Sequence, residues 1–392
     1  MKRVCPICSG ETRGEGSVLL ARAAHSHLAS RVDRVLQNAG IKHTRRDSIV
    51  TITAPNSSAR GHVAKVLLMG LSPVERKLVQ LGGGHLAHLF GGPDVDQYAR
   101  IVETEWFDRA LAEDEFSIYF QPIVDLKANR TFAYESLIRL EGDRLHNGAD
   151  IVEAATMRGQ VLEFDSYARI KAVQTAAKQQ LPNTQLFVNF FPSAVYDPGP
   201  CMESMIAAVG QSGYRPQDIV FEILECDQIT NVEHTRNICQ FFRRQGFRYA
   251  LDDLGAGTNG VDMIEMLQPD YVKIDKSIIW NLSQPVQRSL LDRAVALAAR
   301  AGAAVIAEGI ETPQMATAVK NLGIHMMQGY FFGKPNPVMR DELNLAGAAD
   351  LKTLAQVMQI PQESPEPAGE PTSSSQLELV PVSSASSRRT PS

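Results

Sequence analysis

Several features of common protein classes are missing from this sequence. Its 5 cysteines are scattered over 392 residues, too few for a disulfide framework, which indicates a reducing compartment. No run approaches the roughly 18 apolar residues of a membrane-spanning helix. The basic start of the chain also lacks the apolar stretch of a secretory signal. We therefore expect a cytoplasmic protein without a membrane segment.

The composition that is present is that of a globular protein. Apolar residues make up 44% of the chain and charged residues 21%, which excludes wholesale disorder, collagen and a pure coiled coil. At about 150 residues per domain, the length predicts two or three domains, or one large barrel with accessory segments.

Charge is unevenly distributed along the chain. Residues 1–100 carry 14 Lys and Arg against 7 Asp and Glu, whereas the remainder carries 25 against 37. The basic N-terminal segment could bind nucleic acid, an anionic surface or the acidic remainder of the chain. Because no aromatic-interleaved arginine cluster accompanies the charge, we favour a solvated surface and expect no direct nucleic-acid binding.

The two ends of the chain differ from its middle. Residues 361–392 contain 6 Pro and 9 Ser, a composition that predicts a disordered tail, and a helix at 346–360 precedes it. Residues 1–95 read as a small α/β domain with a regulatory or interaction role, whose signal or protein partner the sequence does not identify. Within it we expect a helix at 25–37, a short strand at 47–53 and one or two helices at 59–80.

Residues 105–345 show eight short β-rich runs that alternate with amphipathic helical stretches. This number and length match an α/β fold of the (β/α)₈ type, a TIM-like barrel. An open doubly wound sheet is the alternative, but no G-x-G-x-x-G loop follows the first run. The link 126–130 between the first two runs has hairpin length, so the barrel should begin with an antiparallel strand. The runs span residues 116–125, 131–139, 186–189, 219–224, 249–253, 271–274, 305–307 and 327–331.

Polar side chains recur where these runs end. In a barrel the carboxyl ends of the strands converge on one face, and crowded carboxylates there need a counter-ion. Singly, each is more often a helix cap or a solvated residue, so the argument rests on their recurrence. Oxygen ligands favour Mg²⁺ or Mn²⁺ over zinc, and two such ions about 3.5–4 Å apart suit phosphoryl displacement. The residues are Glu135, Asn189, Glu222, Glu225, Asp252, Asp253, Lys273, Glu308 and Glu311.

An ordered set of motifs resembles the EAL family of cyclic di-GMP phosphodiesterases. The resemblance spans about 105–340 and implies a (β/α)₈ barrel with an antiparallel first strand. It also implies bacterial cyclic di-GMP signalling, hydrolysis of cyclic di-GMP to linear pGpG with two Mg²⁺ or Mn²⁺ ions, and a homodimer formed through the barrel. The motifs are QPIV, YESLIR, VNF, FEILE, DDLGAG, VKID, AEGIET and QGYFFGKP.

Carried over motif by motif, the resemblance assigns roles to single residues. Glu135, Asn189, Glu222 and Asp252 would bind one metal ion, and Asp252 would bridge to a second ion that Asp253 helps to hold. Lys273 would orient the nucleophilic water, with Glu308 as a ligand or general base. The remaining assignments are Gln121, Arg139 and Gln328 for substrate binding, with Gln328 near the metal and water site, and Glu225 and Glu311 for orienting the ligands.

The sequence departs from the family pattern in two places. The signature triplet is Glu135-Ser136-Leu137 where the family has Glu-Ala-Leu, which keeps the carboxylate. The loop usually written DDFGTGYSS reads DDLGAGTNG, so Ala256 lacks a hydroxyl and Gly260 adds flexibility. The chain also contains no diguanylate cyclase signature, Gly-Gly-Asp/Glu-Glu-Phe.

A second metal site is conceivable at the amino terminus. Cys5 and Cys8 form a CPIC knuckle with His25 and His27 downstream. Because the His-x-His spacing is too close for the usual finger, two free thiols are the alternative to structural zinc.

Three functions remain open at this point. The first is a cyclic di-GMP phosphodiesterase, the second is a catalytically weak or inactive cyclic di-GMP receptor that signals through a protein partner, and the third is an interaction scaffold without nucleotide affinity. Because no expected acidic ligand and no lysine is missing, the sequence favours the enzyme.

Overall fold

The structure is a computed structural model that describes residues 18–83, 92–142, 145–179, 184–224, 231–255 and 260–339. The predicted helix 346–360, the tail 361–392 and the CPIC knuckle lie outside these residues. Two parts of the described chain have separate hydrophobic clusters, an N-terminal sheet and a barrel. No helix in the described ranges is both long and apolar enough to cross a bilayer.

The N-terminal part is a four-stranded antiparallel sheet in the order β2-β3-β1-β4. Two β–α–β units interleave to give this order, as in split βαβ folds. The elements are β1 (Val18–Ala23), α1 (Ser26–Asn38), β2 (His43–Arg46), β3 (Ile49–Thr53), α2 (Ser57–Gly70), α3 (Pro73–Lys77), β4 (Val79–Gly83) and α4 (Val95–Glu103).

The small α/β fold is confirmed, with two differences from the expected elements. The one or two helices predicted at 59–80 are two, because the stretch breaks at Ser72, which caps α3 together with Glu75 in a capping box. The end of the predicted stretch, however, belongs to the strand β4. The strand β2 was not predicted because its sequence, HTRR, is short and polar. α1, α2 and α4 contribute the apolar residues that form one core with the sheet.

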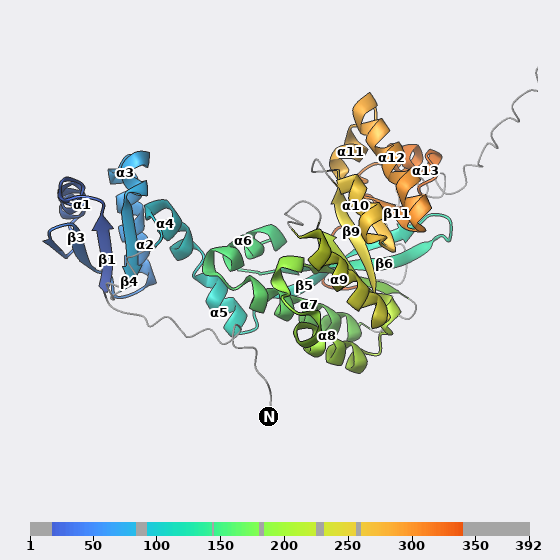
Figure 1. Ribbon diagram of the computed structural model, residues 1–392, viewed down its shortest axis with the longest axis horizontal. Helices are drawn as coiled ribbons and strands as arrows, with labels where there is room; N and C mark the ends of the chain where they lie inside the picture. Colours follow the sequence, from blue (N-terminus) through green and yellow to red (C-terminus); the bar gives the residue numbers. More distant parts are fainter. Residues whose placement is uncertain are drawn as a thin grey trace, which may run out of the picture. The chain divides into compact units, whose positions relative to one another are not determined.

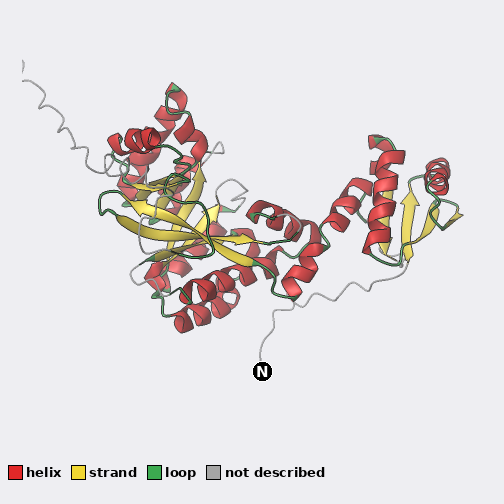
Figure 2. Cartoon of the chain, turned by 180° about the vertical axis from the view of Figure 1, so that it is seen from behind, coloured by secondary structure: helices red, strands yellow, loops and turns green. Residues whose placement is uncertain are grey.

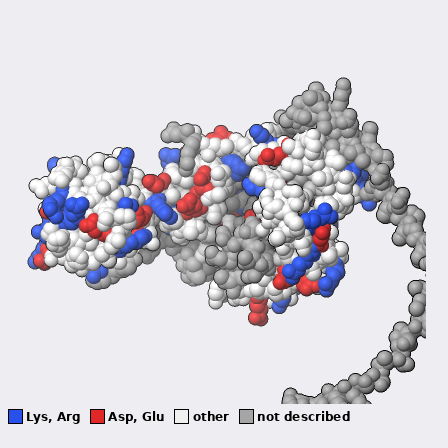
Figure 3. Space-filling view, turned by 90° about the horizontal axis from the view of Figure 1, so that it is seen from above, with Lys and Arg blue, Asp and Glu red and all other residues white. Residues whose placement is uncertain are grey.

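Basic side chains of the N-terminal part are partly paired. Arg76 Nη1 lies 2.9 Å from Asp96 Oδ1, and Arg31 Nε lies 3.8 Å from Glu75 Oε1. Figure 3 shows Lys and Arg interspersed with Asp and Glu on the face of this part that is in view. Whether this surface is only solvated or also binds a partner stays a prediction.

The second part is a closed eight-stranded barrel in the order β5-β6-β7-β8-β9-β10-β11-β12. All neighbouring strands are parallel except that β5 runs antiparallel to both β6 and β12, which confirms the predicted antiparallel first strand. The strands are β5 (Ser117–Asp125), β6 (Arg130–Arg139), β7 (Gln185–Phe190), β8 (Ile219–Leu224), β9 (Arg248–Leu254), β10 (Tyr271–Ile274), β11 (Ala304–Ala307) and β12 (Met326–Gln328).

Helices surround these strands, as Figures 1 and 2 show. Apolar side chains of strands and helices pack between the two layers. The helices are α5 (Trp106–Ala112), α6 (Gly148–Arg158), α7 (Val161–Ala177), α8 (Pro198–Ser212), α9 (Val232–Arg244), α10 (Gly260–Leu267), α11 (Lys276–Trp280), α12 (Pro285–Ala301) and α13 (Pro313–Asn321), with short 3₁₀ turns at Pro192–Ala194 and Pro216–Asp218.

Candidate active site

On seven of the eight barrel strands a polar residue lies two positions from an apolar residue of the barrel interior, and for β11 the polar residue, Glu308, directly follows the end of the strand. Because side chains alternate along a strand, residues two apart point to the same side, about 6.6 Å apart along the strand. One barrel layer is therefore apolar and the next, toward the carboxyl ends of the parallel strands, is polar. The pairs are Ile123 and Gln121, Ala133 and Glu135, Phe187 and Asn189, Val220 and Glu222, Ala250 and Asp252, Tyr271 and Lys273, Ile306 and Glu308, and Met326 and Gln328.

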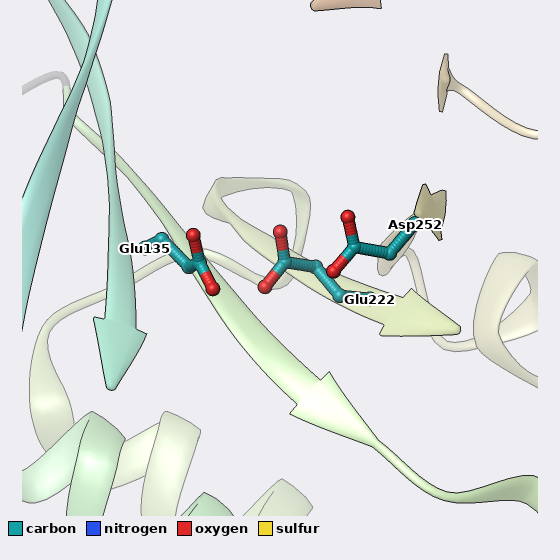
Figure 4. Close-up of side chains that lie close together, drawn as sticks. All are labelled: Glu135, Glu222 and Asp252. Atoms are coloured by element: carbon teal, nitrogen blue, oxygen red, sulfur yellow. The ribbon is translucent and has the colours of Figure 1, made fainter. Parts of the chain in front are cut away.

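The polar layer brings together carboxylates that are far apart in sequence. One oxygen each of Glu135, Glu222 and Asp252 lie within 4.8 Å of one another, and Figure 4 shows these carboxylates side by side. A second group of the same size consists of Asp252, Asp253 and Glu308. Asp252 thus belongs to both groups, which suits a carboxylate that two cations share.

Lys273 lies at the centre of this layer and is buried. Its Nζ is 2.6 Å from Glu222 Oε1, 2.8 Å from Glu308 Oε1, 3.0 Å from Asp252 Oδ1 and 3.5 Å from Glu135 Oε2. Burial by itself would lower the pKa of the lysine, but the four surrounding carboxylates outweigh it and hold this pKa well above its usual value. Lys273 therefore stays charged.

One ammonium group does not balance the carboxylates around it. Burial raises the pKa of Glu222 well above its ordinary value, and repulsion from Glu135 and Asp252 adds to this. Burial and the charge of Asp252 likewise raise the pKa of Glu308, and the same two causes raise the pKa of Asp253 to about 6. The site holds surplus negative charge in a poorly solvated place, which is the electrostatic condition for binding cations.

A left-handed residue places two consecutive aspartates in one group. Asp253 has φ 53°, a conformation that Asp tolerates better than most residues, and its backbone N–H donates to Asp252 Oδ1 at 2.9 Å. The chain therefore turns at the end of β9, and both carboxylates take part in the group with Glu308.

Neighbouring side chains hold the acidic residues in position. Gln328 Nε2 donates to Glu135 Oε2 at 2.6 Å. Asn189 lies on β7 in register with Glu222 on β8. The segment after Asn189 is held by a buried ion pair, because Asp165 accepts a hydrogen bond from the Phe191 N–H at 3.3 Å and pairs with Arg169 at 2.7 Å.

A cleft of about 260 Å³ opens beside the acidic layer. Five of its lining residues were predicted as site residues, namely Gln121, Asp253, Glu308, Glu311 and Gln328. Six were not; all of these except Trp280 lie within or directly after the quoted motifs VKID, AEGIET and QGYFFGKP, which is the signal that could have found them. These are Asp275, Lys276, Trp280, Gly309, Gly329 and Tyr330.

Two of the predicted residues, Arg139 and Glu225, belong neither to the polar layer nor to the described lining of the cleft. Arg139 donates from Nη1 to the Ile138 carbonyl at 2.8 Å and does not line the cleft. Its role in substrate binding stays a prediction. Glu225 and the loop residues 256–259 lie outside the described residues.

Comparison with known proteins identifies the family of this barrel. The model of the EAL domain family matches residues 104–335, and the chain belongs to this family. It is similar to the probable cyclic di-GMP phosphodiesterase PdeD of Escherichia coli strain K12, with 26% identity over 247 residues; the match covers 61% of this chain and 45% of PdeD. The chain thus spans about half or less of the length of such curated relatives.

Two solved structures support the same fold. A standalone EAL protein from Vibrio cholerae O395, in a form with bound cyclic di-GMP, is 29% identical, has a TM-score of 0.52, and the match covers 59% of this chain and 98% of that one. The Bacillus subtilis YkuI protein, in complex with cyclic di-GMP and calcium, is 22% identical with a TM-score of 0.56, and the match covers 64% of this chain and 62% of YkuI. The (β/α)₈ barrel expected from the sequence is confirmed.

Proposed function

We propose that this protein hydrolyses cyclic di-GMP to linear pGpG in a reaction that needs two Mg²⁺ or Mn²⁺ ions. The observation that carries the proposal is the pair of carboxylate groups that share Asp252 around the charged Lys273. The names of similar proteins, which are phosphodiesterases or complexes with cyclic di-GMP, supply the substrate.

The donor set fits hard divalent cations. Glu222 is fully buried; its Oε1 lies 2.6 Å from Lys273 Nζ, and among the described residues its Oε2 has no hydrogen-bond partner. Glu135, Asn189, Glu222 and Asp252 would hold one ion, and Asp252 and Asp253 the other. The ions would supply Lewis-acid stabilisation of the phosphoryl oxygens and activation of water.

The remaining residues would position the attacking water, accept its proton or bind the substrate. Lys273 stays protonated, so it donates hydrogen bonds and positions the attacking water rather than accepting a proton. Glu308 has a raised pKa, and a carboxylate tuned upward is suited to take a proton from that water as general base. Gln121 and Gln328 would contact the substrate from the floor of the cleft, and Arg139 would bind a phosphate.

Two further properties belong to the proposal. Residues 1–95 would serve regulation or interaction with a partner, and the protein would form a homodimer through the barrel. Light scattering on the purified chain measures the second property directly.

The decisive assay is conversion of cyclic di-GMP to pGpG by the intact chain with Mg²⁺ or Mn²⁺. Asp252→Asn removes a charge from both carboxylate groups and should lower kcat/KM by about 10³-fold, since such stabilisation amounts to several kcal/mol. Glu203→Gln, an exposed carboxyl group on α8, is the matched control and should leave the rate unchanged.

The outcome also separates the enzyme from its alternatives. Lys273→Ala should reduce turnover while nucleotide binding persists. Tight binding by the wild-type chain without pGpG formation would favour the receptor, for which the altered loop DDLGAGTNG is the motivating observation. Absence of binding would favour the scaffold.

A further inference from the structure

One wall of the cleft is aromatic and lies outside the acidic layer. Trp280, the last residue of α11, lines the cleft and is 50% exposed. Tyr330 lines it too and is 53% exposed. Large aromatic side chains are usually buried more completely, and their exposure in a concave site is typical of a ligand contact.

Trp280 is fixed in position without a ligand. Its Nε1–H donates to the Gly309 carbonyl at 2.7 Å. Gly309 has φ 66°, and a Cβ there would lie 2.3 Å from Lys276 Cβ and 3.1 Å from Trp280 Nε1. The turn that follows Glu308 therefore packs directly on α11, and only glycine permits this approach. A ring held in this way loses little conformational entropy when a ligand stacks on it.

A positive charge accompanies each aromatic ring. The Nζ of Lys276 lies over the Trp280 ring, 5.6 Å from its centroid, and the Nζ of Lys334 lies over the Tyr330 ring, 5.4 Å from its centroid. A ring with an ammonium group over one face can offer its opposite face to a nucleobase, and the ammonium group offers a charge to a phosphate. These are the two groups that each half of a cyclic dinucleotide carries.

We propose that Trp280 is a stacking platform for one guanine base of the cyclic dinucleotide and that Lys276 binds the phosphate beside that base. The proposal rests on the proposed function, because it takes cyclic di-GMP as the ligand. It adds two binding residues on α11, Lys276 and Trp280, that none of the strand-end motifs supplies.

The chain contains only two tryptophans, which makes the contact directly observable. Trp106 lies on α5, where its ring contacts that of His146 in a tilted arrangement with ring centroids 4.2 Å apart, and it does not line the cleft. In Trp106→Phe protein the tryptophan fluorescence, excited selectively over that of the tyrosines, therefore comes from Trp280 alone. The probe is cyclic di-GMP in Ca²⁺, the ion present with this nucleotide in the YkuI structure. Equilibrium dialysis measures Kd independently, and Trp106→Phe should bind as the wild type does.

Two replacements separate the ring from its N–H group. Trp280→Ala should raise Kd by about tenfold or more, the range for loss of one base–aromatic stack. Trp280→Phe keeps an aromatic face but loses the bond to Gly309, and should raise Kd by less than about threefold. Titration of Trp106→Phe protein should quench the Trp280 emission with the Kd found by dialysis. Circular dichroism checks that each variant is folded.

Several results would overturn the inference. Wild-type affinity in folded Trp280→Ala, or unchanged Trp280 emission at saturating nucleotide, would show that the base does not stack there. An equal loss in Trp280→Phe and Trp280→Ala would show that the hydrogen bond to Gly309 matters instead of the ring. A wild-type chain that fails to bind cyclic di-GMP would refute the proposed function itself and this inference with it.

Discussion

The two interior layers of the barrel are built on the same eight strands, yet they have opposite character. The apolar layer, with Phe187 and Val220 at 0% exposure, resembles any protein core. Two residues further along, the polar layer buries carboxylates around Lys273. Burial of apolar surface stabilises the fold, whereas burial of carboxylates of like charge opposes it. Stability and chemistry are therefore assigned to separate levels of one barrel.

This separation predicts different consequences for a change in each layer. Phe187→Ala empties a site in the apolar layer, where the ring packs near Tyr271 with centroids 5.2 Å apart. Loss of a buried phenylalanine costs about 3–5 kcal/mol, which denaturant unfolding measures. The folded variant should keep pGpG production within severalfold of the wild type, because the carboxylates are untouched.

A substitution in the polar layer, Asp252→Asn, is the control for that measurement. Asp252→Asn should lower activity strongly while the free energy of unfolding of the metal-free protein changes much less or rises. If Phe187→Ala abolished activity in fully folded protein, or if Asp252→Asn unfolded the chain, the two layers would not be separable.

The polar layer should also make stability depend on pH. The Asp253 pKa is raised from 3.8 to about 6, first by burial and then by Asp252. A group whose pKa is higher in the folded state contributes stability below its unfolded pKa, and this contribution is lost as pH rises through the folded value. Metal-free protein should therefore lose stability between about pH 4 and pH 7 through this group, as urea unfolding would measure.

Asp253→Asn provides the comparison for this pH dependence. It removes the titrating carboxyl group, so its unfolding free energy should fall less over the same pH range than that of the wild type. Saturating Mg²⁺ should reduce the difference, because a bound cation offsets the charge. Parallel pH profiles for the two metal-free proteins would contradict the assignment.

The sequence predicted which residues form the polar layer better than it predicted the ion pairs between them. The carboxylates were recognisable because they recur within or at the end of β-rich runs, and eight such runs define a barrel. The central place of Lys273 between four carboxylates depends on barrel closure, which brings β6, β8, β9 and β11 around β10. Trp280 was missed because it lies on a short helix after a strand end, where no acidic pattern marks it. In the N-terminal part, β4 was missed because its first residues closely follow a helical segment and were included in the helical prediction.

Ser136, directly beside the acidic layer, tests at a single side chain whether stabilising and catalytic roles are separate. It stands next to Glu135 but on the other face of β6, because side chains alternate along a strand, and its Oγ donates to the Phe187 carbonyl of β7 at 2.8 Å. Ser136→Ala restores the usual Glu-Ala-Leu triplet and should cost about 1 kcal/mol of stability, the net value of one hydrogen bond. Activity should stay within about twofold of the wild type, because the hydroxyl group points away from the carboxylates.

An activity loss in Ser136→Ala comparable to that of Asp252→Asn would mean that the bond between β6 and β7 positions Glu135 for metal binding. The affinity for Mn²⁺ distinguishes the two cases: it should be unchanged if Ser136 serves only the strand pair, and reduced if it positions the carboxylate. Because Glu135 is also held by Gln328 at 2.6 Å from within the barrel, we expect the first result. The chemistry of this site is then fixed by contacts inside the barrel, and the buried Ser136 on the other face serves the pairing of β6 with β7.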